Sequence, residues 1–321
     1  MSKPIDLDSP RYDQSVYLGR AKHFLTLTNP LNVFASEAQL NEARDVVTEF
    51  RKTKRMPAGY DEEKLWAAKY LYDSAYHPDT GEKMIVIGRM AAQAPMNTII
   101  TGCMITFYKT NAATVFWQWV NQTFNAVVNY TNRSGKAELS KSQLLASYMA
   151  ACGGALTTAI YLNKKVKHMK NPIYARLVPF AAVCGANLIN IPMMRSNELI
   201  NGTPVFAEPT SEMVGNSTKA ATMGIALVCI SRILMAMPGM TITPVIVNIA
   251  TKRGMFCRYP MAVIPFQLFL VGLSVTFATP LCCAIFEQRA TIGVDKIEPE
   301  LQETMKKKYP KEKHVYFNKG L

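Results

Sequence analysis

Five polar side chains that stand in long apolar stretches are the residues of this sequence best suited to binding a small solute. They are one arginine and four asparagines: Arg232, Asn97, Asn125, Asn187 and Asn190. A guanidinium can grip a carboxylate through two parallel hydrogen bonds, and a carboxamide can both donate and accept. These residue types predict a site for a small zwitterion, such as an amino acid with a hydroxyl side chain.

Structural roles could also account for the same side chains. Arg232 could extend toward the membrane surface, or bond backbone carbonyls that are released by a helix break at Pro238. The asparagines could join neighbouring helices, at roughly 0.6 to 2 kcal/mol each. Because polar groups inside a membrane are costly, a functional role is the first hypothesis for them, and both interpretations stay open from the residues alone.

The distribution of charge predicts the elements that position these residues. Residues 90–286 hold only 19 of the 59 charged residues of this 321-residue chain. A helix needs about 20 apolar residues to cross a hydrocarbon layer about 30 Å thick. We therefore predict an all-α, polytopic membrane protein with about five spans, at about 90–108, 142–163, 177–194, 220–251 and 259–286.

Several of these spans contain prolines that should kink or break them. The predicted break positions are Pro95, Pro192, Pro238 and Pro244. The segment 220–251 is too long for one straight crossing at 1.5 Å per residue, so we expect it to break near Pro238. Broken helices offer free backbone groups to a substrate near the membrane midplane, as in many secondary transporters.

The segment from about 112 to 130 has a different pattern, with apolar and polar residues on opposite helical faces. Apolar positions are Phe116, Val120, Phe124 and Val127, and polar positions are Gln118, Asn121, Asn125, Asn129 and Asn132. This spacing predicts an amphipathic helix. A helix lying flat at the membrane interface is the favoured interpretation, and a helix lining a polar cavity is the alternative.

Two arms flank the predicted membrane domain of residues 90–286. Residues 1–89 predict a soluble helical arm, with a capping box at Ser36 and Gln39. The motif that contains His77, Pro78, Asp79 and Gly81 predicts a tight turn rather than a metal site. Residues 287–321 form a basic C-terminal arm, which could contact anionic lipid or be merely solvated; its lysines include Lys306, Lys307, Lys308, Lys311, Lys313 and Lys319.

The basic residues also bear on partners and orientation. The net charge of +13 comes from residues that flank apolar runs, so we expect a lipid bilayer as the partner and no nucleic acid. With five crossings, the basic loops at 164–170 and 252–258 lie on the side of the N-terminal arm. This arm is then predicted to face the cytosol or the matrix.

Motifs for catalysis or cofactor binding are missing from the sequence. It has no nucleotide-binding loop, no GxSxG, no HExxH and no CxxC pair, and its four histidines are scattered. We therefore expect no enzyme, no cofactor and no metal site.

Long ordered motifs resemble those of the sideroflexin family, above all its serine-transporting branch. They are DLDSPRYDQSVYLGRAKHFLTLTNP at 6–30, HPDTGEKMIVIGRM at 77–90, FWQWVNQTFNAVVNYTNRSG at 116–135, INIPMMR at 189–195, SRILMAMPGM at 231–240, FATPLCCAIF at 277–286 and the ending VYFNKGL. The resemblance extends from one end of the chain to the other.

The resemblance implies a multi-pass protein of the mitochondrial inner membrane, imported by the carrier-type machinery. In that membrane, the loop charges predict that the N-terminal arm faces the matrix. Its implied role is to move serine, and also alanine and cysteine, into the matrix for one-carbon metabolism. No catalytic residues come with the family. An alternative role is a membrane scaffold or a factor in iron and haem homeostasis that acts through the soluble arm.

Overall fold

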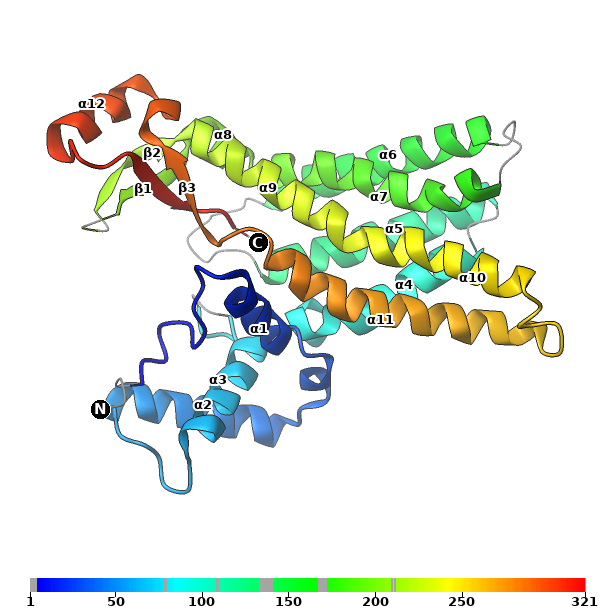
Figure 1. Cartoon of the computed structure of the whole chain (residues 1–321), viewed down its shortest axis with the longest axis horizontal. Coiled ribbons are helices and arrows are strands. Elements are labelled where there is room, and N and C mark those ends of the chain that lie inside the picture. Colours follow the sequence, from blue (N-terminus) through cyan, green and yellow to red (C-terminus); the bar gives the residue numbers. More distant parts are fainter. Residues whose placement is uncertain are drawn as a thin grey trace. The chain divides into compact units, whose positions relative to one another are not determined.

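The protein folds into two compact helical units, each assembled from separate parts of the chain (Figure 1). The computed structural model describes residues 5–77, 80–107, 110–132, 141–166, 172–208, 210 and 212–320. The first unit comprises Met1–Glu138 and Pro238–Ala284, and the second comprises Leu139–Met237 and Ile285–Leu321. Each unit therefore combines membrane helices with a polar part outside them.

The N-terminal arm of the first unit is a small helical core. Its elements are α1 (Tyr17–Leu27), the 3-10 helix η1 (Pro30–Phe34), α2 (Glu37–Thr53) and α3 (Glu62–Ala75). The predicted capping box is confirmed, since the Ser36 hydroxyl accepts from the Gln39 amide and the Gln39 side chain accepts from the Ser36 amide. Leu40, Phe50 and Leu65 are buried between α2 and α3, as apolar residues with helical spacing should be.

A tight turn follows the arm, as the sequence predicts. The His77 amide donates to the Glu82 carbonyl at 2.8 Å, and the Gly81 amide donates to the His77 carbonyl at 2.9 Å. Gly81 has a φ of 70°, which glycine adopts without a steric penalty. Pro78 and Asp79 lie outside the described residues.

The first unit continues with helices that pack through small residues. Short 3-10 helices, η2 (Val86–Gly88) and η3 (Met90–Ala92), lead into α4 (Gln93–Phe107), and α5 (Asn111–Thr131) follows. The later part comprises the π-helical turn η4 (Pro238–Ile242), α10 (Thr243–Lys252), η5 (Pro260–Ala262) and α11 (Val263–Cys283). Gly102 faces Leu268 so closely that a Cβ would lie 2.2 Å from its Cδ2, so α4 and α11 are in tight contact.

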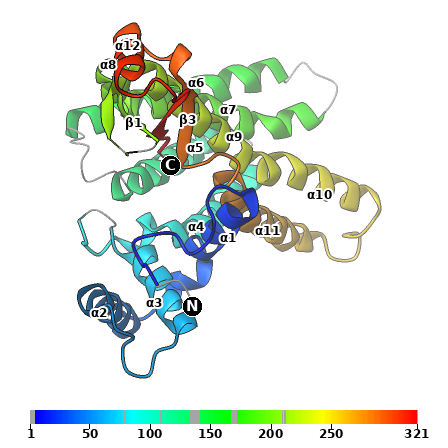
Figure 2. The same ribbon diagram turned by 60° about the vertical axis from the view of Figure 1, so that its left-hand side comes forward.

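The second unit is built on a pair of long helices, α6 (Lys141–Val166) and α7 (Pro172–Met194), which lie side by side (Figures 1 and 2). Alanines at 151, 155 and 159 of α6 and at 182 and 186 of α7 are buried. Small residues allow the two backbones to approach. The chain then passes through α8 (Ser196–Asn201) and a hairpin into α9 (Thr218–Met237).

A four-stranded antiparallel sheet in the second unit was not predicted from the sequence. Its strands are β1 (Thr203–Ala207), β2 (Met213–Ser217), β3 (Arg289–Gly293) and β4 (His314–Asn318), in the order β2-β1-β4-β3. The helices η6 (Val294–Lys296) and α12 (Pro299–Lys308) lie between β3 and β4 in the sequence. The C-terminal arm, which the sequence suggested could be merely solvated, therefore supplies β3, α12 and β4. That interpretation is wrong, because Val315 and Phe317 are fully buried.

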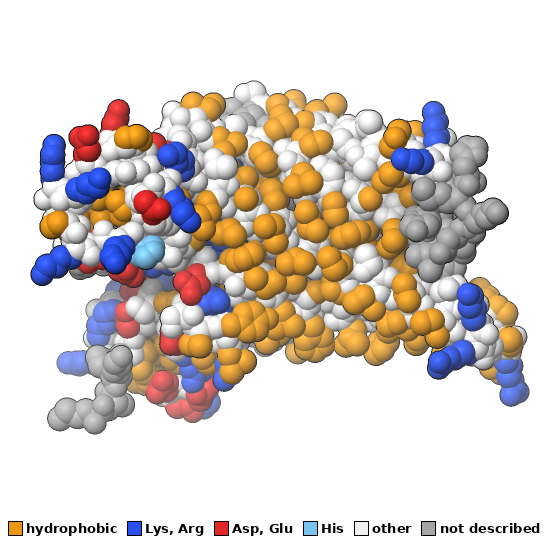
Figure 3. All heavy atoms as spheres, turned by 45° about the horizontal axis from the view of Figure 1, so that its top comes forward, with side chains coloured by type: hydrophobic (Ala, Val, Ile, Leu, Met, Phe, Trp, Pro, Cys, Tyr) orange, Lys and Arg blue, Asp and Glu red, His pale blue; other side chains and the backbone are white. Residues whose placement is uncertain are grey.

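Four described helices are long and apolar enough to cross a membrane. They cover Leu145–Lys165, Leu177–Met194, Thr218–Lys252 and Pro260–Cys283. The first predicted span, 90–108, corresponds to α4, which has only 15 residues and does not belong to this set. Hydrophobic side chains gather over the helices, and charged side chains gather near their ends (Figure 3). The all-α, polytopic class is confirmed, with the small sheet as an addition.

Candidate functional site

Three of the predicted site residues share one helix pair of the second unit, α7 and α9. Ile191 near the end of α7 clusters with Ile225, Val228 and Cys229 in the middle of α9, and the two helices run in opposite directions (Figure 1). Asn187 lies one turn before Ile191, and Arg232 lies one turn after Val228 and Cys229. Helical geometry therefore places Asn187 and Arg232 at the same level of the pair.

The polar groups of this pair differ in exposure. Asn190 is buried, at 5% exposure, whereas Asn187 and Arg232 are half-buried. Ser231, next to Arg232, is buried, and its hydroxyl donates to the Leu227 carbonyl one turn earlier at 3.0 Å. The Ser231 hydroxyl is thus bonded within its own helix, and Arg232 and the two asparagines carry the groups that suit a small zwitterion by type.

Asn97 and Asn125 belong to the first unit. The Asn97 amide nitrogen donates to Oε1 of Gln93 at 2.9 Å, one turn earlier on α4. Asn125 is half-buried on α5. The five predicted residues are thus divided between the two units.

The amphipathic helix α5 buries part of its polar face, together with the apolar side chains of Phe124 and Val128. Gln118, Asn121 and Gln122 are 0%, 4% and 2% exposed, whereas Phe116 and Trp119 are 49% and 51% exposed. A helix at a water interface would hold its polar side chains out. An apolar outer face with a polar inner face is typical of a membrane helix that borders a polar interior.

Two amide nitrogens on this buried face are unsatisfied. Nδ2 of Asn121 and Nε2 of Gln122 are buried and have no hydrogen-bond partner among the described residues. An unmet buried donor costs about 1–3 kcal/mol, so a solute or water that accepts from it has a large incentive to bind. The regular spacing of polar residues in α5 was visible in the sequence. The sequence did not single out Gln122, and it did not show that these polar side chains are buried.

The four prolines predicted to break helices fall at three kinds of position. Pro238 opens the π-helical turn η4 between α9 and α10, where such turns often mark functional sites. Pro95 and Pro244 lie in the first turns of α4 and α10, and Pro192 lies in the last turn of α7. Proline is tolerated in a first turn because its missing N–H would be unsatisfied there anyway.

The turn η4 lies within ordinary van der Waals distance of α11 and α4, and beside another unmet polar atom. A Cβ on Gly239 would lie 3.7 Å from Val275 of α11 and 4.0 Å from Thr101 of α4. Thr243, which follows the turn, is 1% exposed, and its hydroxyl has no partner among the described residues. By contrast, Gln267 of α11 donates to the Thr106 hydroxyl at 2.8 Å and so joins α11 to α4.

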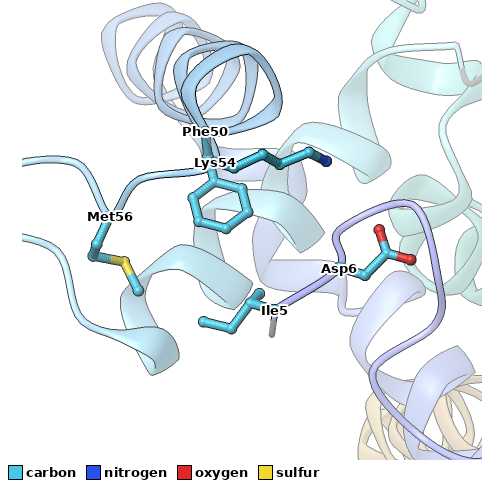
Figure 4. A pocket seen from close by; sticks show the side chains of 5 residues that line it. All are labelled: Ile5, Asp6, Phe50, Lys54 and Met56. Carbon is cyan, nitrogen blue, oxygen red and sulfur yellow. The ribbon is translucent and has the colours of Figure 1, made fainter. Parts of the chain in front are cut away.

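The arm carries a shallow pocket that is part of its own packing. Ile5, Phe50 and Met56 line it, with the Asp6 carboxylate and the Lys54 ammonium on one side (Figure 4). Phe50 is a core residue at 4% exposure. The described residues contain no group of three or more His, Cys, Asp or Glu side chains that could hold a metal ion.

Outside the membrane helices, one carboxylate of the second unit is strongly perturbed. Burial would raise the pKa of Glu298, but hydrogen bonds from Ser217, Thr218 and Lys219 outweigh burial and hold the pKa at about 2. Its Oε1 accepts from the Thr218 and Lys219 amides at 2.9 and 3.1 Å. Glu298 thus caps the N-terminus of α9, where a negative charge is favourable.

These features define a polytopic α-helical membrane protein in which several polar side chains are buried between helices. The model of the family described as Sideroflexins matches residues 6–321. The chain therefore belongs to the sideroflexin family, as its motifs predict.

Relatives in animals agree along nearly the whole length. The chain is 57% identical to Sideroflexin-1-3 of Drosophila melanogaster and 52% identical to Sideroflexin-1 of Homo sapiens, each over 99% of this chain and 98% of the relative. It is 51% identical to Sideroflexin-3 of Mus musculus over the same shares. No solved structure matches the chain.

Proposed function

We propose that this protein is a transporter of small neutral amino acids in the mitochondrial inner membrane, with serine as its main substrate and alanine and cysteine as further substrates. The observation that carries the proposal is the buried polar face of α5, with its two unmet amide donors. Leaving buried donors unmet is costly, and a bound polar solute would offset this cost.

Arg232 is our candidate for holding the substrate carboxylate. A guanidinium matches a carboxylate in shape and charge. Asn187 at the same level of the α7–α9 pair, together with Asn190, can accept from the substrate ammonium or hydroxyl. Asn97 and Asn125 are further candidates in the first unit. Asn97 is hydrogen-bonded to Gln93 of α4, and Asn125 is half-buried on α5.

The break at Pro238 supports the same function. A π-helical turn weakens the regular backbone ladder inside a 35-residue apolar segment, Thr218–Lys252. Discontinuous helices offer backbone donors and acceptors to a substrate and allow two helix segments to move separately.

The proposed setting includes the N-terminal arm on the matrix side and import through the carrier-type machinery. The resemblance of the motifs supports this setting, and so do the seven basic residues of the loops at 164–170 and 252–258. The second candidate function is a membrane scaffold or a factor in iron and haem homeostasis. The arm, which has its own core, is the feature that favours it.

Uptake of radiolabelled serine into liposomes that contain the purified protein tests the proposal. We expect saturable uptake that unlabelled serine, alanine and cysteine reduce, above the level of protein-free vesicles. Uptake equal to that of protein-free vesicles, with folded and inserted protein, contradicts transport and favours the scaffold.

A further inference from the structure

Five large apolar side chains are exposed on the N-terminal arm just before α4. Leu31 and Phe34 of η1 are 71% and 81% exposed, and Ile85, Val86 and Ile87 around η2 are 55%, 46% and 47% exposed. We call these five residues the junction collar. Exposed apolar groups at this density mark an interaction site rather than a water-facing surface.

The collar residues come together at one place in the first unit. The helices η1 and η2 both pack against η3, and both also contact α4. Because η3 leads directly into α4, the two parts of the collar surround the N-terminal end of that helix. Two segments about 50 residues apart in the sequence therefore form one apolar surface.

Packing between α4 and α11 fixes the level of this surface relative to the membrane. Ala94 clusters with Val271 and Val275, Thr98 lies against Gly272, and Gly102 lies against Leu268. Residue numbers rise along α4 as they fall along α11, so the two helices are antiparallel. The residues that precede Gln93 must then lie beside the C-terminal end of α11.

That end of α11 is also the end of a membrane span. The apolar segment Pro260–Cys283 stops there, and the polar residues Glu287 and Gln288 follow soon after. The collar is therefore at the level where hydrocarbon gives way to lipid headgroups.

The arm is fastened to the same end of α11 by hydrogen bonds. Nε of Arg20 donates to the Ala284 carbonyl at 2.8 Å, and the Tyr17 hydroxyl donates to the Leu281 carbonyl at 3.3 Å. Arg20 is only 7% exposed. These bonds hold α1, and with it the arm, against the membrane boundary.

We propose that the junction collar inserts into the interfacial layer of the lipid bilayer and docks the N-terminal arm on the membrane surface. Apolar faces of peripheral segments bury about 5–10 Å into the boundary of headgroups and acyl chains. The partner is the bilayer itself, because the collar continues the apolar level of a membrane span. This inference does not depend on which solute the protein transports.

Fluorescence quenching in reconstituted full-length protein tests the docking. Cys257, the exposed cysteine among those described, is replaced by serine, and a bimane label is placed on Phe34→Cys. Lipids that carry a doxyl group near the headgroup should quench this label at least about threefold more than a label on Thr53→Cys, an exposed arm position outside the collar. The signal of the C257S parent is subtracted from both.

Two further measurements keep the test decisive. Val86→Cys should behave like Phe34→Cys, and it replaces that variant if the latter does not fold. Equal, weak quenching by doxyl lipid at 34, 86 and 53 overturns the proposal. Shielding of residue 34 from aqueous iodide without quenching by doxyl lipid also overturns it, because protein rather than lipid then covers the collar.

Discussion

At the scale of single residues, a substitution of Asn121 can distinguish a role in binding the substrate from a role in joining helices. Its amide nitrogen is buried without a partner among the described residues. Replacing an unmet polar group with an apolar one of similar size is neutral or stabilising. Asn121→Leu should therefore keep or raise the thermal stability in detergent while it lowers serine uptake by about tenfold or more, since one lost hydrogen bond to a charged group is worth about 1.5–3 kcal/mol.

The matched control is Asn201→Leu at the exposed end of α8, which should leave uptake unchanged. A clear loss of stability in Asn121→Leu, with uptake in proportion to the folded protein that remains, would show that Asn121 joins helices instead.

Glu298 offers a residue-level prediction about pH. Its pKa is lowered from 4.5 to about 2 by hydrogen bonds that outweigh burial. A lowered pKa stabilises the fold above the unfolded value, and this contribution is lost as pH falls from about 4.5 toward 2. Glu298→Gln should cost about 1–2 kcal/mol at pH 7, as the loss of a helix cap does.

Thermal unfolding of both proteins between pH 7 and pH 3 checks this prediction. The difference in stability should shrink toward pH 3, because the unfolded carboxylate takes up a proton below about pH 4.5 while the folded one, with a pKa of about 2, stays ionised. A difference that is constant with pH would mean that the charge of Glu298 contributes nothing.

The residues themselves could be found only in part from the sequence. A polar side chain in an apolar run is visible at once, which is how Arg232 and Asn190 were identified. The burial of Asn121 and Gln122 could not be predicted from the sequence, because an amphipathic pattern reveals two helical faces but not which of them contacts lipid.

At the scale of elements, β4 is the strand on which the sheet of the second unit depends. It lies between β1 and β3 and pairs with both. Truncation after Lys313 should therefore abolish the sheet and sharply reduce the yield of folded protein, as judged by size-exclusion chromatography in detergent. Backbone groups of both neighbours would lose their partners.

A double substitution of the exposed Lys306 and Lys307 by Gln is the control, and it should leave the yield unchanged. A truncated protein that is as abundant and as stable as the full chain would show that the sheet is dispensable.

Elements with local signals could be predicted, and those made by distant pairing could not. The cap at Ser36, the turn at Gly81 and the break at Pro238 each depend on residues a few positions apart. The sheet joins two five-residue strands near position 210 to two beyond position 289. Strands of five residues are too short for an alternating pattern to stand out in the sequence.

At the scale of the whole molecule, charge segregation predicts the class correctly because a membrane helix must exclude charge along its entire length. Within the first predicted span, 90–108, the described residues form a 3-10 helix at 90–92 and the α-helix Gln93–Phe107.

Serine uptake by the Arg232→Gln variant decides whether this arginine binds the substrate. The measurement compares liposomes that contain wild-type protein, the variant, or Arg44→Gln, a matched change at an exposed ion pair with Asp45 of the arm. We expect saturable uptake by the wild type and by Arg44→Gln, and a loss of about tenfold or more in Arg232→Gln with insertion intact. Unchanged uptake by Arg232→Gln would remove this arginine from the substrate site, and uptake by none of the three would contradict transport itself.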